Sequence, residues 1–162
     1  MILRVNEYDD LVPVIRVLNK SFGTVAVEFG LTKENCPSNS AFIDVETLKS
    51  QFNENREFYK ESDENTCVGF VGIEKSLREK GTFYIEKLAV SPEYRHRGIG
   101  KKLIDFAENR ITALGGIRAS IAIIYDNILL RKWYLSTGYS ETLIKEFAHL
   151  PFKKVCFMEK LL

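Results

Sequence analysis

Residues 91–103, SPEYRHRGIGKKL, join an apolar strand-like run to an amphipathic run and carry two glycines and four formal positive charges. The whole chain is nearly neutral, with 23 Lys and Arg against 22 Asp and Glu. Positive charge is therefore concentrated at one junction, where a helix is predicted to begin. A helix N-terminus offers unpaired amides and a positive partial charge, so this stretch predicts an anion site.

Composition limits the class of protein. A chain of 162 residues with 45% hydrophobic and 28% charged residues is typical of one globular domain. Three scattered cysteines and two histidines give no metal-ligand spacing, so no metal is expected. The neutral balance argues against nucleic acid, no signal peptide is expected from the charged residues near the start, and no apolar run approaches ~20 residues. We therefore expect a cytoplasmic protein that binds no nucleic acid and no membrane.

The first half of the chain predicts one strand and two helices. Apolar residues recur at helical spacing after each group of capping residues, while the segment between them has no steady period. The expected elements are a strand over residues 1–5, a helix after Asp9 or Asp10, an irregular loop or broken helix over 23–40, and a helix after Asn39 or Ser40.

The second half alternates strands and helices, which predicts an α/β domain with a mixed sheet. The crossover through the helix over 98–114 should be right-handed and join parallel strands. The expected elements are an antiparallel hairpin of TCVGFVGIEK and GTFYIEKLAV, the helix over 98–114, a buried strand IRASIAIIY, a helix from Asp126 or Asn127 to Gly138, and two closing strands.

The basic junction suits a pyrophosphate. Glycines at 98 and 100 would let an anion approach the backbone amides of residues 98–102. Neither familiar phosphate loop fits, because a Walker A motif lacks its first glycine here and a dinucleotide motif would need glycine at Leu103. The alternative is a solvated turn that happens to be basic. The side chains expected to reach the anion are Arg95, Arg97, Lys101 and Lys102.

Two motifs resemble the GNAT superfamily of N-acetyltransferases. The family pattern [RQ]-x-x-G-x-[GA] matches residues 95–100, RHRGIG, which follow a family-like strand and turn, LAVSPEY. Later, DNILLRKWYLSTGY is similar to the family segment N-x-x-A-x-x-x-Y-x-x-x-G-[FY], with Leu130 in place of the small residue. The resemblance covers about residues 66–140 in detail and the whole chain in outline.

The resemblance implies a single-domain GNAT fold over residues 1–162. Such a fold has a mixed, mostly antiparallel sheet of about seven strands, flanked by four helices and splayed between strands 4 and 5. It also implies acetyl-CoA as cosubstrate, with no metal. The cofactor-binding residues implied are Leu88, Ala89, Val90, Arg95, Arg97, Gly98, Ile99, Gly100, Lys101, Lys102 and Asn127.

Acetyl transfer needs a neutral amine, stabilisation of an oxyanion and a proton for the leaving thiolate. With a pKa near 10.4, only about one alkylamine in a thousand is neutral at pH 7. The family resemblance makes Tyr134 the candidate acid, although a core tyrosine is the alternative. Glu86 lies in the apolar run FYIEKLAV and is the candidate base, directly or through water, unless it is a surface carboxylate. Asn127 could equally serve as a helix cap.

The acceptor is not defined by the sequence. We expect direct attack by a primary amine in a ternary complex, and the amine could belong to a small molecule or a peptide. Glu28, Glu34 and Asn35 could meet a cationic amine or could be solvated loop residues. A non-catalytic acyl-CoA-binding module on the same fold is the alternative function, and either a monomer or a homodimer is workable.

Overall fold

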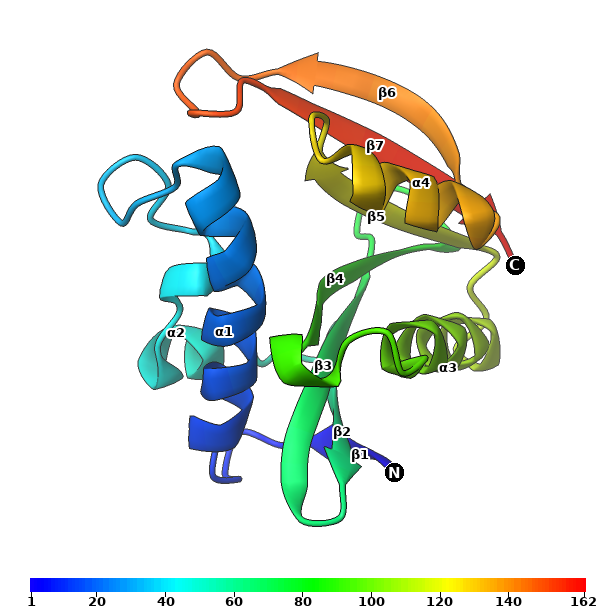
Figure 1. Cartoon of the computed structure of the whole chain (residues 1–162). Helices are drawn as coiled ribbons and strands as arrows, with labels where there is room; N and C mark the ends of the chain where they lie inside the picture. The colour runs from blue at the N-terminus through cyan, green and yellow to red at the C-terminus, as the bar shows by residue number, and fades with distance from the viewer.

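The computed structural model describes residues 1–162 and confirms the α/β fold class, with a seven-stranded mixed sheet and four α-helices (Figure 1). The strands run in the order β1-β2-β3-β4-β5-β7-β6 across the sheet. The strands are β1 (Ile2–Val5), β2 (Arg56–Asp63), β3 (Thr66–Lys75), β4 (Thr82–Val90), β5 (Arg118–Ile124), β6 (Ser140–Glu146) and β7 (Lys154–Leu161), and the helices are α1 (Val12–Phe29), α2 (Val45–Ser50), α3 (Ile99–Ala113) and α4 (Ile128–Ser136).

The helices lie on both faces of the sheet, α1 and α2 on one face and α3 and α4 on the other (Figure 1). Each face has its own core, because the central strands project apolar side chains to both faces. On the α1 side, Leu18 packs with Phe58 and Phe70. On the α3 side, Leu103 and Ile111 belong to the larger core. None of the helices combines the length and apolar character needed to span a membrane.

The sheet divides between β4 and β5, as expected. These two strands are parallel, but they pair only over Thr82–Tyr84 and Arg118–Ser120. Beyond this short ladder β4 continues beside β3, whereas β5 stays paired with β7 through Ile124. Figure 1 shows the two strands moving apart from this junction. The separation leaves unpaired strand edges inside the sheet, where a ligand can lie.

A β-bulge interrupts β4 just before its end. The pairing with β3 passes from Glu86 opposite Gly72 to Ala89 opposite Phe70, so β4 has one extra residue there. Lys87 takes a positive φ of 52° within this irregularity. Bulges re-aim side chains, and the alternation expected along β4 is lost at Lys87 and Leu88.

Two details of the N-terminal half differ from the sequence-based expectation. Helix α1 continues to Phe29 through the first part of the segment that we expected to be irregular, because Ala26 packs in a small cluster with Leu31 and Cys36. The helix then ends at Gly30, whose φ is 65°. Tertiary packing here outweighs the weak periodicity of the sequence.

The second expected helix is divided into two short pieces. Asn39 does cap a turn of 3₁₀ helix over Ser40–Phe42, by accepting a hydrogen bond from the Ala41 amide. Asp44 then starts α2 by accepting from the Thr47 amide at 2.8 Å. Strand β2 has no residue-level counterpart in the sequence analysis, because its polar residues obscure the alternation.

Candidate active site

A cavity of about 540 Å³ lies where β4 and β5 separate. Most of its wall is apolar, and only three of its lining residues carry a charge, Glu74, Glu86 and Lys87. The lining residues are Phe22, Val25, Asn39, Glu74, Tyr84, Ile85, Glu86, Lys87, Leu88, Ser120, Ile121, Ala122, Ile123, Ile124, Asn127, Leu130, Tyr134, Phe152, Val155 and Phe157. Apolar walls with a few convergent polar groups are typical of a small-molecule site.

Both residues expected to carry catalysis line this cavity. Tyr134 projects from α4 and is 5% exposed, with its ring 4.9 Å from that of Trp133 and 5.5 Å from that of Tyr139. Its hydroxyl makes no hydrogen bond within the chain, and burial raises its pKa above the ordinary 10.0. The phenol is therefore protonated at neutral pH and free to donate to a ligand.

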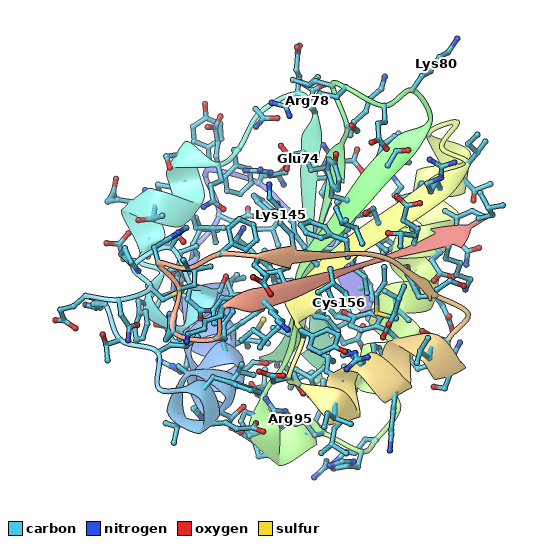
Figure 2. The ribbon with its side chains drawn as sticks, turned by 90° about the horizontal axis from the view of Figure 1, so that it is seen from above. Glu74, Arg78, Lys80, Arg95, Lys145 and Cys156 are labelled. Carbon is cyan, nitrogen blue, oxygen red and sulfur yellow. The ribbon has the colours of Figure 1, made fainter.

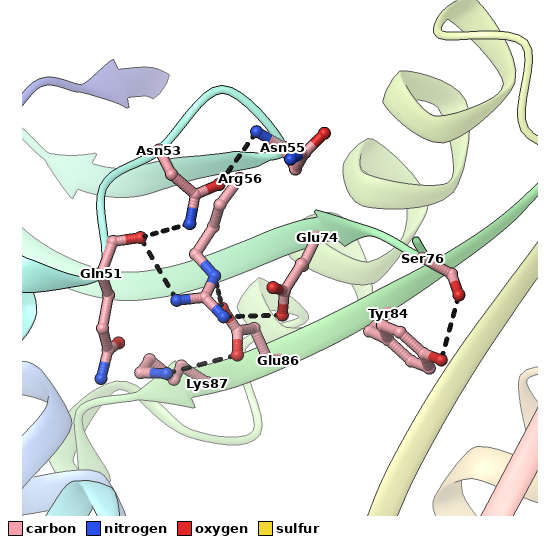
Figure 3. Close-up of polar contacts among 9 residues, drawn as sticks. All are labelled: Gln51, Asn53, Asn55, Arg56, Glu74, Ser76, Tyr84, Glu86 and Lys87. Carbon is pink, nitrogen blue, oxygen red and sulfur yellow. Dashed lines mark hydrogen bonds and ion pairs between the residues drawn. The ribbon is translucent and has the colours of Figure 1, made fainter. Parts of the chain in front are cut away.

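Glu86 lies between two cations (Figure 3). Arg56 Nε is 2.9 Å from Glu86 Oε1, and Lys87 Nζ donates to Glu86 Oε2 at 3.3 Å. The contact with Arg56 lacks the alignment of a hydrogen bond, and Oε1 is buried. Oε2 is therefore the atom left to meet a ligand in the cavity. Regular strand alternation would point Lys87 to the face opposite Glu86, and the bulge explains why the two side chains pair instead.

The sequence analysis missed Arg56, Glu74 and Tyr84, which form a row across three strands. Arg56 lies directly opposite Glu74, and Glu74 lies directly opposite Tyr84. Arg56 Nη2 donates to Glu74 Oε2 at 2.6 Å, and the Tyr84 hydroxyl is 3.2 Å from Ser76 Oγ (Figure 3). We call these three residues the polar row. Only the strand register places them together, and a single sequence does not give that register.

The N-terminus of α3 has no side-chain cap and begins after a glycine. Gly98 precedes the helix with a φ of 78°, and no side chain caps the first turn. A Cβ atom built at Gly98 would meet nothing within 4 Å, so the space beside this residue is open. At Gly100 the nearest side chains are Trp133 at 3.6 Å and Val90 at 3.8 Å. The turn therefore borders both α4 and the end of β4. Ile99, the first helical residue, lies between these glycines.

The four basic side chains of this turn have different surroundings. Arg97 is exposed and lies over the ring of Tyr94. Arg95 is held by α1, because its Nη2 donates to the Ser21 carbonyl at 3.0 Å and to Thr24 Oγ1 at 3.1 Å. The guanidinium of Arg95 thus ties the turn to α1.

Both lysines of the first turn form ion pairs within the chain. Lys101 Nζ pairs with Asp105 at 2.6 Å, and Lys102 Nζ pairs with Glu61 at 2.6 Å. Burial opposes ionisation of Glu61, but hydrogen bonds from Lys102 and the terminal amine outweigh burial and lower its pKa. Lys102 therefore links α3 to β2, whereas Arg97 forms no ion pair and donates to the Glu93 carbonyl at 3.2 Å.

The end of β4 presents backbone groups to both sides. The Ser91 amide donates to Val68 of β3 at 2.9 Å. Because backbone groups of successive strand residues point to opposite edges, those of Val90 face the gap and those of Ala89 face Phe70 of β3. Arg95 Nε donates to the Val90 carbonyl at 3.4 Å, which is consistent with a carbonyl that points away from β3. Leu88 lines the cavity itself.

Asn127 caps α4, by accepting the Leu130 amide at 3.2 Å, and also lines the cavity. The expected acceptor residues Glu28, Glu34 and Asn35 do not line it. All three are exposed, and the Asn35 side chain donates to the Gly30 carbonyl. From this part of the chain, the cavity is lined instead by Asn39 and by the apolar residues Phe22 and Val25 of α1.

Solved structures with the same fold are numerous. The ribosomal-protein-S18-alanine N-acetyltransferase of Escherichia coli matches with a TM-score of 0.77 at 14% identity, over 99% of this chain and 92% of that one. PaiA N-acetyltransferase of Thermoplasma acidophilum, solved with coenzyme A, gives 0.76 at 20%, over 100% and 98%. An aminoglycoside 6'-N-acetyltransferase of Enterococcus faecium gives 0.70 at 16%, over 99% and 96%. Identities this low establish the fold alone.

The family is established by sequence. No curated protein is similar in sequence to this chain. The model of the Acetyltransferase (GNAT) family, however, matches residues 29–139, which is more than half of the chain. This span contains both sequence motifs and most of the strands that bound the cavity. The chain therefore belongs to the GNAT family of acetyltransferases, enzymes that transfer acyl groups from acyl-CoA.

Proposed function

We propose that this acetyltransferase moves an acetyl group from acetyl-CoA to a primary amine by direct attack in a ternary complex. The observation that supports this most is the position of Tyr134 and Glu86 in one cavity, at the point where β4 and β5 separate. The open N-terminus of α3 borders the same place through Val90 and Trp133. We assign the activity to one domain over residues 1–162, acting in the cytoplasm.

The chain offers a fitting place for acetyl-CoA. Open space in front of Gly98 and uncapped amides at the start of α3 suit a pyrophosphate. Backbone groups of Val90 face the gap between the strands, where an extended arm could pair with them. When bound, acetyl-CoA supplies an activated acyl thioester. The residues assigned to its binding are Leu88, Val90, Arg95, Arg97, Gly98, Ile99, Gly100, Lys101, Lys102 and Asn127; Ala89 only links Leu88 to Val90, because its backbone groups face β3.

In this proposal, Tyr134 holds the proton that a departing thiolate needs. Its hydroxyl stays protonated because burial raises its pKa, and it has no competing hydrogen bond within the chain. Trp133 and Tyr139 pack against its ring and limit its orientation. Proton transfer by one positioned side chain typically raises the reaction rate by about 10²–10⁴-fold.

Glu86 accepts the proton of the attacking amine, either directly or through one water. Its carboxylate is oriented by Arg56 on one side and Lys87 on the other. The Oε2 atom carries this role, because Oε1 is buried against Arg56.

The first test is a calorimetric titration of the purified protein with acetyl-CoA, using ATP and NAD as controls. We expect acetyl-CoA alone to bind. Addition of a panel of primary amines to the acetyl-CoA complex should then release free thiol in proportion to product. If acetyl-CoA does not bind at moderate salt, or if ATP binds equally well, the α3 turn is not a coenzyme site and the proposal is wrong.

A further inference from the structure

We infer that the acceptor is a primary amine with a single positive charge and an apolar body, and that Glu74 is the residue that binds its ammonium group. This inference rests on the proposed function and specifies its substrate class. It follows from three features of the cavity: its balance of charge, one carboxylate oxygen without a partner, and its largely apolar wall.

The charge of the cavity is balanced without a ligand. Its two carboxylates, Glu74 and Glu86, are matched by Lys87 in the lining and by Arg56 behind them. Arg56 contacts both carboxylates, and its side chain is only 15% exposed, so neither pair is strongly screened by solvent. No surplus of negative charge remains to attract several cations.

Glu74 nevertheless keeps one oxygen for a ligand. Oε2 is paired with Arg56 at 2.6 Å, whereas Oε1 has no hydrogen bond within the chain and is not buried. The Glu74 side chain is 32% exposed, whereas that of Glu86, the other carboxylate in the cavity, is 23% exposed. Glu74 Oε1 can therefore accept one charge-assisted hydrogen bond from an ammonium group.

Tyr84 lies beside Glu74 at the point where the sheet divides. It is the last residue of β4 paired with β5, and its side chain is 38% exposed. Its hydroxyl has one neighbour, Ser76 Oγ, and retains capacity for another hydrogen bond (Figure 3). Figure 2 shows Glu74 and Arg95 on opposite sides of the molecule, so this corner is separate from the basic turn.

Most of the rest of the cavity wall is apolar. Phe22 and Val25 of α1 lie on one side, and Phe152, Val155 and Phe157 of the β6–β7 region lie on the other. Phe152 also packs with the end of α1, in the cluster around Ala26 and Leu31, so the two sides meet. An acceptor body in contact with these residues gains from burying carbon, whereas a polyhydroxylated body would leave its polar groups unpaired.

The nearby charge on β6 is also unfavourable to polycations. Lys145 lies directly opposite Val155, a cavity residue, and directly opposed residues project from the same face of a sheet. The Lys145 side chain therefore projects on the same face of the sheet as Val155, with its ammonium 5.2 Å from the centre of the Phe147 ring. A second or third positive charge on the acceptor would meet Lys145 or Lys87 and would have no free carboxylate to bind.

The test is calorimetric binding of 2-phenylethylamine to the protein saturated with CoA, in which no transfer can occur. We expect 2-phenylethylamine to bind at least about tenfold more tightly than spermidine, kanamycin or the uncharged control 2-phenylethanol. Equal or tighter binding of spermidine or kanamycin would overturn the inference. So would equal binding of 2-phenylethanol, or a failure of all these amines to bind.

A Glu74→Gln variant tests the assigned residue. Its Kd for 2-phenylethylamine should rise roughly 10- to 100-fold, the loss expected for one charged hydrogen bond, while its Kd for acetyl-CoA stays the same. The matched control is Glu46→Gln, the same change at a carboxylate of α2 that is 85% exposed and absent from the cavity. An unchanged amine Kd in Glu74→Gln would overturn the assignment. If the unmodified protein does not bind acetyl-CoA, that result would instead contradict the proposed function.

Discussion

The turn before α3 and the polar row of Arg56, Glu74 and Tyr84 are built in opposite ways. The turn uses consecutive residues, and at Gly98 it presents backbone groups to open space. The polar row uses side chains from β2, β3 and β4, and two of its members are already paired with each other. A backbone site is insensitive to side-chain exchange but sensitive to an added Cβ or charge, whereas a side-chain site depends on every packing contact that orients it.

The largest effect is expected at the backbone site. Gly98→Asp adds a carboxylate where no atom lies within 4 Å, in front of the amides assigned to the pyrophosphate. Like-charge repulsion at close range should weaken acetyl-CoA binding by more than about 100-fold, measured by calorimetry. Asp tolerates a positive φ better than most residues, so the domain should remain folded.

The chain offers a matched control for this change. Gly115, just beyond the other end of α3, has a φ of 80° against 78° at Gly98, and it also has no atom within 4 Å of a built Cβ. Gly115→Asp should leave acetyl-CoA binding unchanged within about twofold, because it lies far along the helix from the turn. Equal losses in the two variants would mean that strain, not the anion site, accounts for the effect.

The second effect concerns Tyr134, which belongs to neither region and lines the cavity. Tyr134→Phe removes only the hydroxyl, so kcat should fall by about 100-fold with little change in the Kd for acetyl-CoA. Because burial raises the pKa of Tyr134 above 10.0, its acid form persists up to that pH. The kcat of the unmodified enzyme should therefore show no loss from tyrosine ionisation below about pH 10. Unchanged turnover in Tyr134→Phe would remove this residue from the mechanism.

Tyr139→Phe is the control for Tyr134→Phe. Tyr139 is buried against Tyr134, with ring centroids 5.5 Å apart, but it does not line the cavity. Its loss should alter kcat by less than about threefold, since the hydroxyl lies outside the reacting volume. A matching loss in both variants would point to packing around α4 instead of proton donation.

A third change, Gly72→Ala, tests whether the reaction depends on the position of the Glu86 side chain. Gly72 lies opposite both Phe58 and Glu86, and a Cβ there would come within 3.0 Å of Glu86 Cγ and of the Phe58 ring. Gly72→Ala should displace Glu86 and lower kcat/KM for the amine by roughly tenfold, with acetyl-CoA binding retained. Kinetics and calorimetry on the same preparation measure the two quantities.

Adding Phe58→Leu separates the two contacts of Gly72. The smaller side chain relieves the contact with the ring, while the contact with Glu86 remains. We expect the double variant Gly72→Ala, Phe58→Leu to keep the tenfold loss. Recovery of kcat/KM in the double variant would show that core strain, and not the position of Glu86, caused the loss.

The sequence predicted one of the compared regions and not the other for a physical reason. The turn before α3 is local, so its residues and their spacing were visible, and the splay between β4 and β5 followed from the family resemblance. The polar row depends on strand register, and β2 had not been assigned to residues at all. Pairing of Lys87 with Glu86 depends on a bulge, which shifts side-chain direction by one residue.

The smallest predicted effect tests why α1 extends beyond its sequence-based limit. Gly23 lies inside α1 and Gly30 ends it, and a built Cβ would meet nothing within 4 Å at either position. Only the backbone differs, since Gly30 has a φ of 65°. Gly23→Ala should therefore stabilise the protein by about 0.5–1 kcal/mol, and Gly30→Ala should destabilise it by about 1 kcal/mol, both measured by urea unfolding. If Gly23→Ala also destabilised the protein, the last turns of α1 would not be held as a regular helix in solution, and the Phe22 and Val25 wall of the cavity would lose its support.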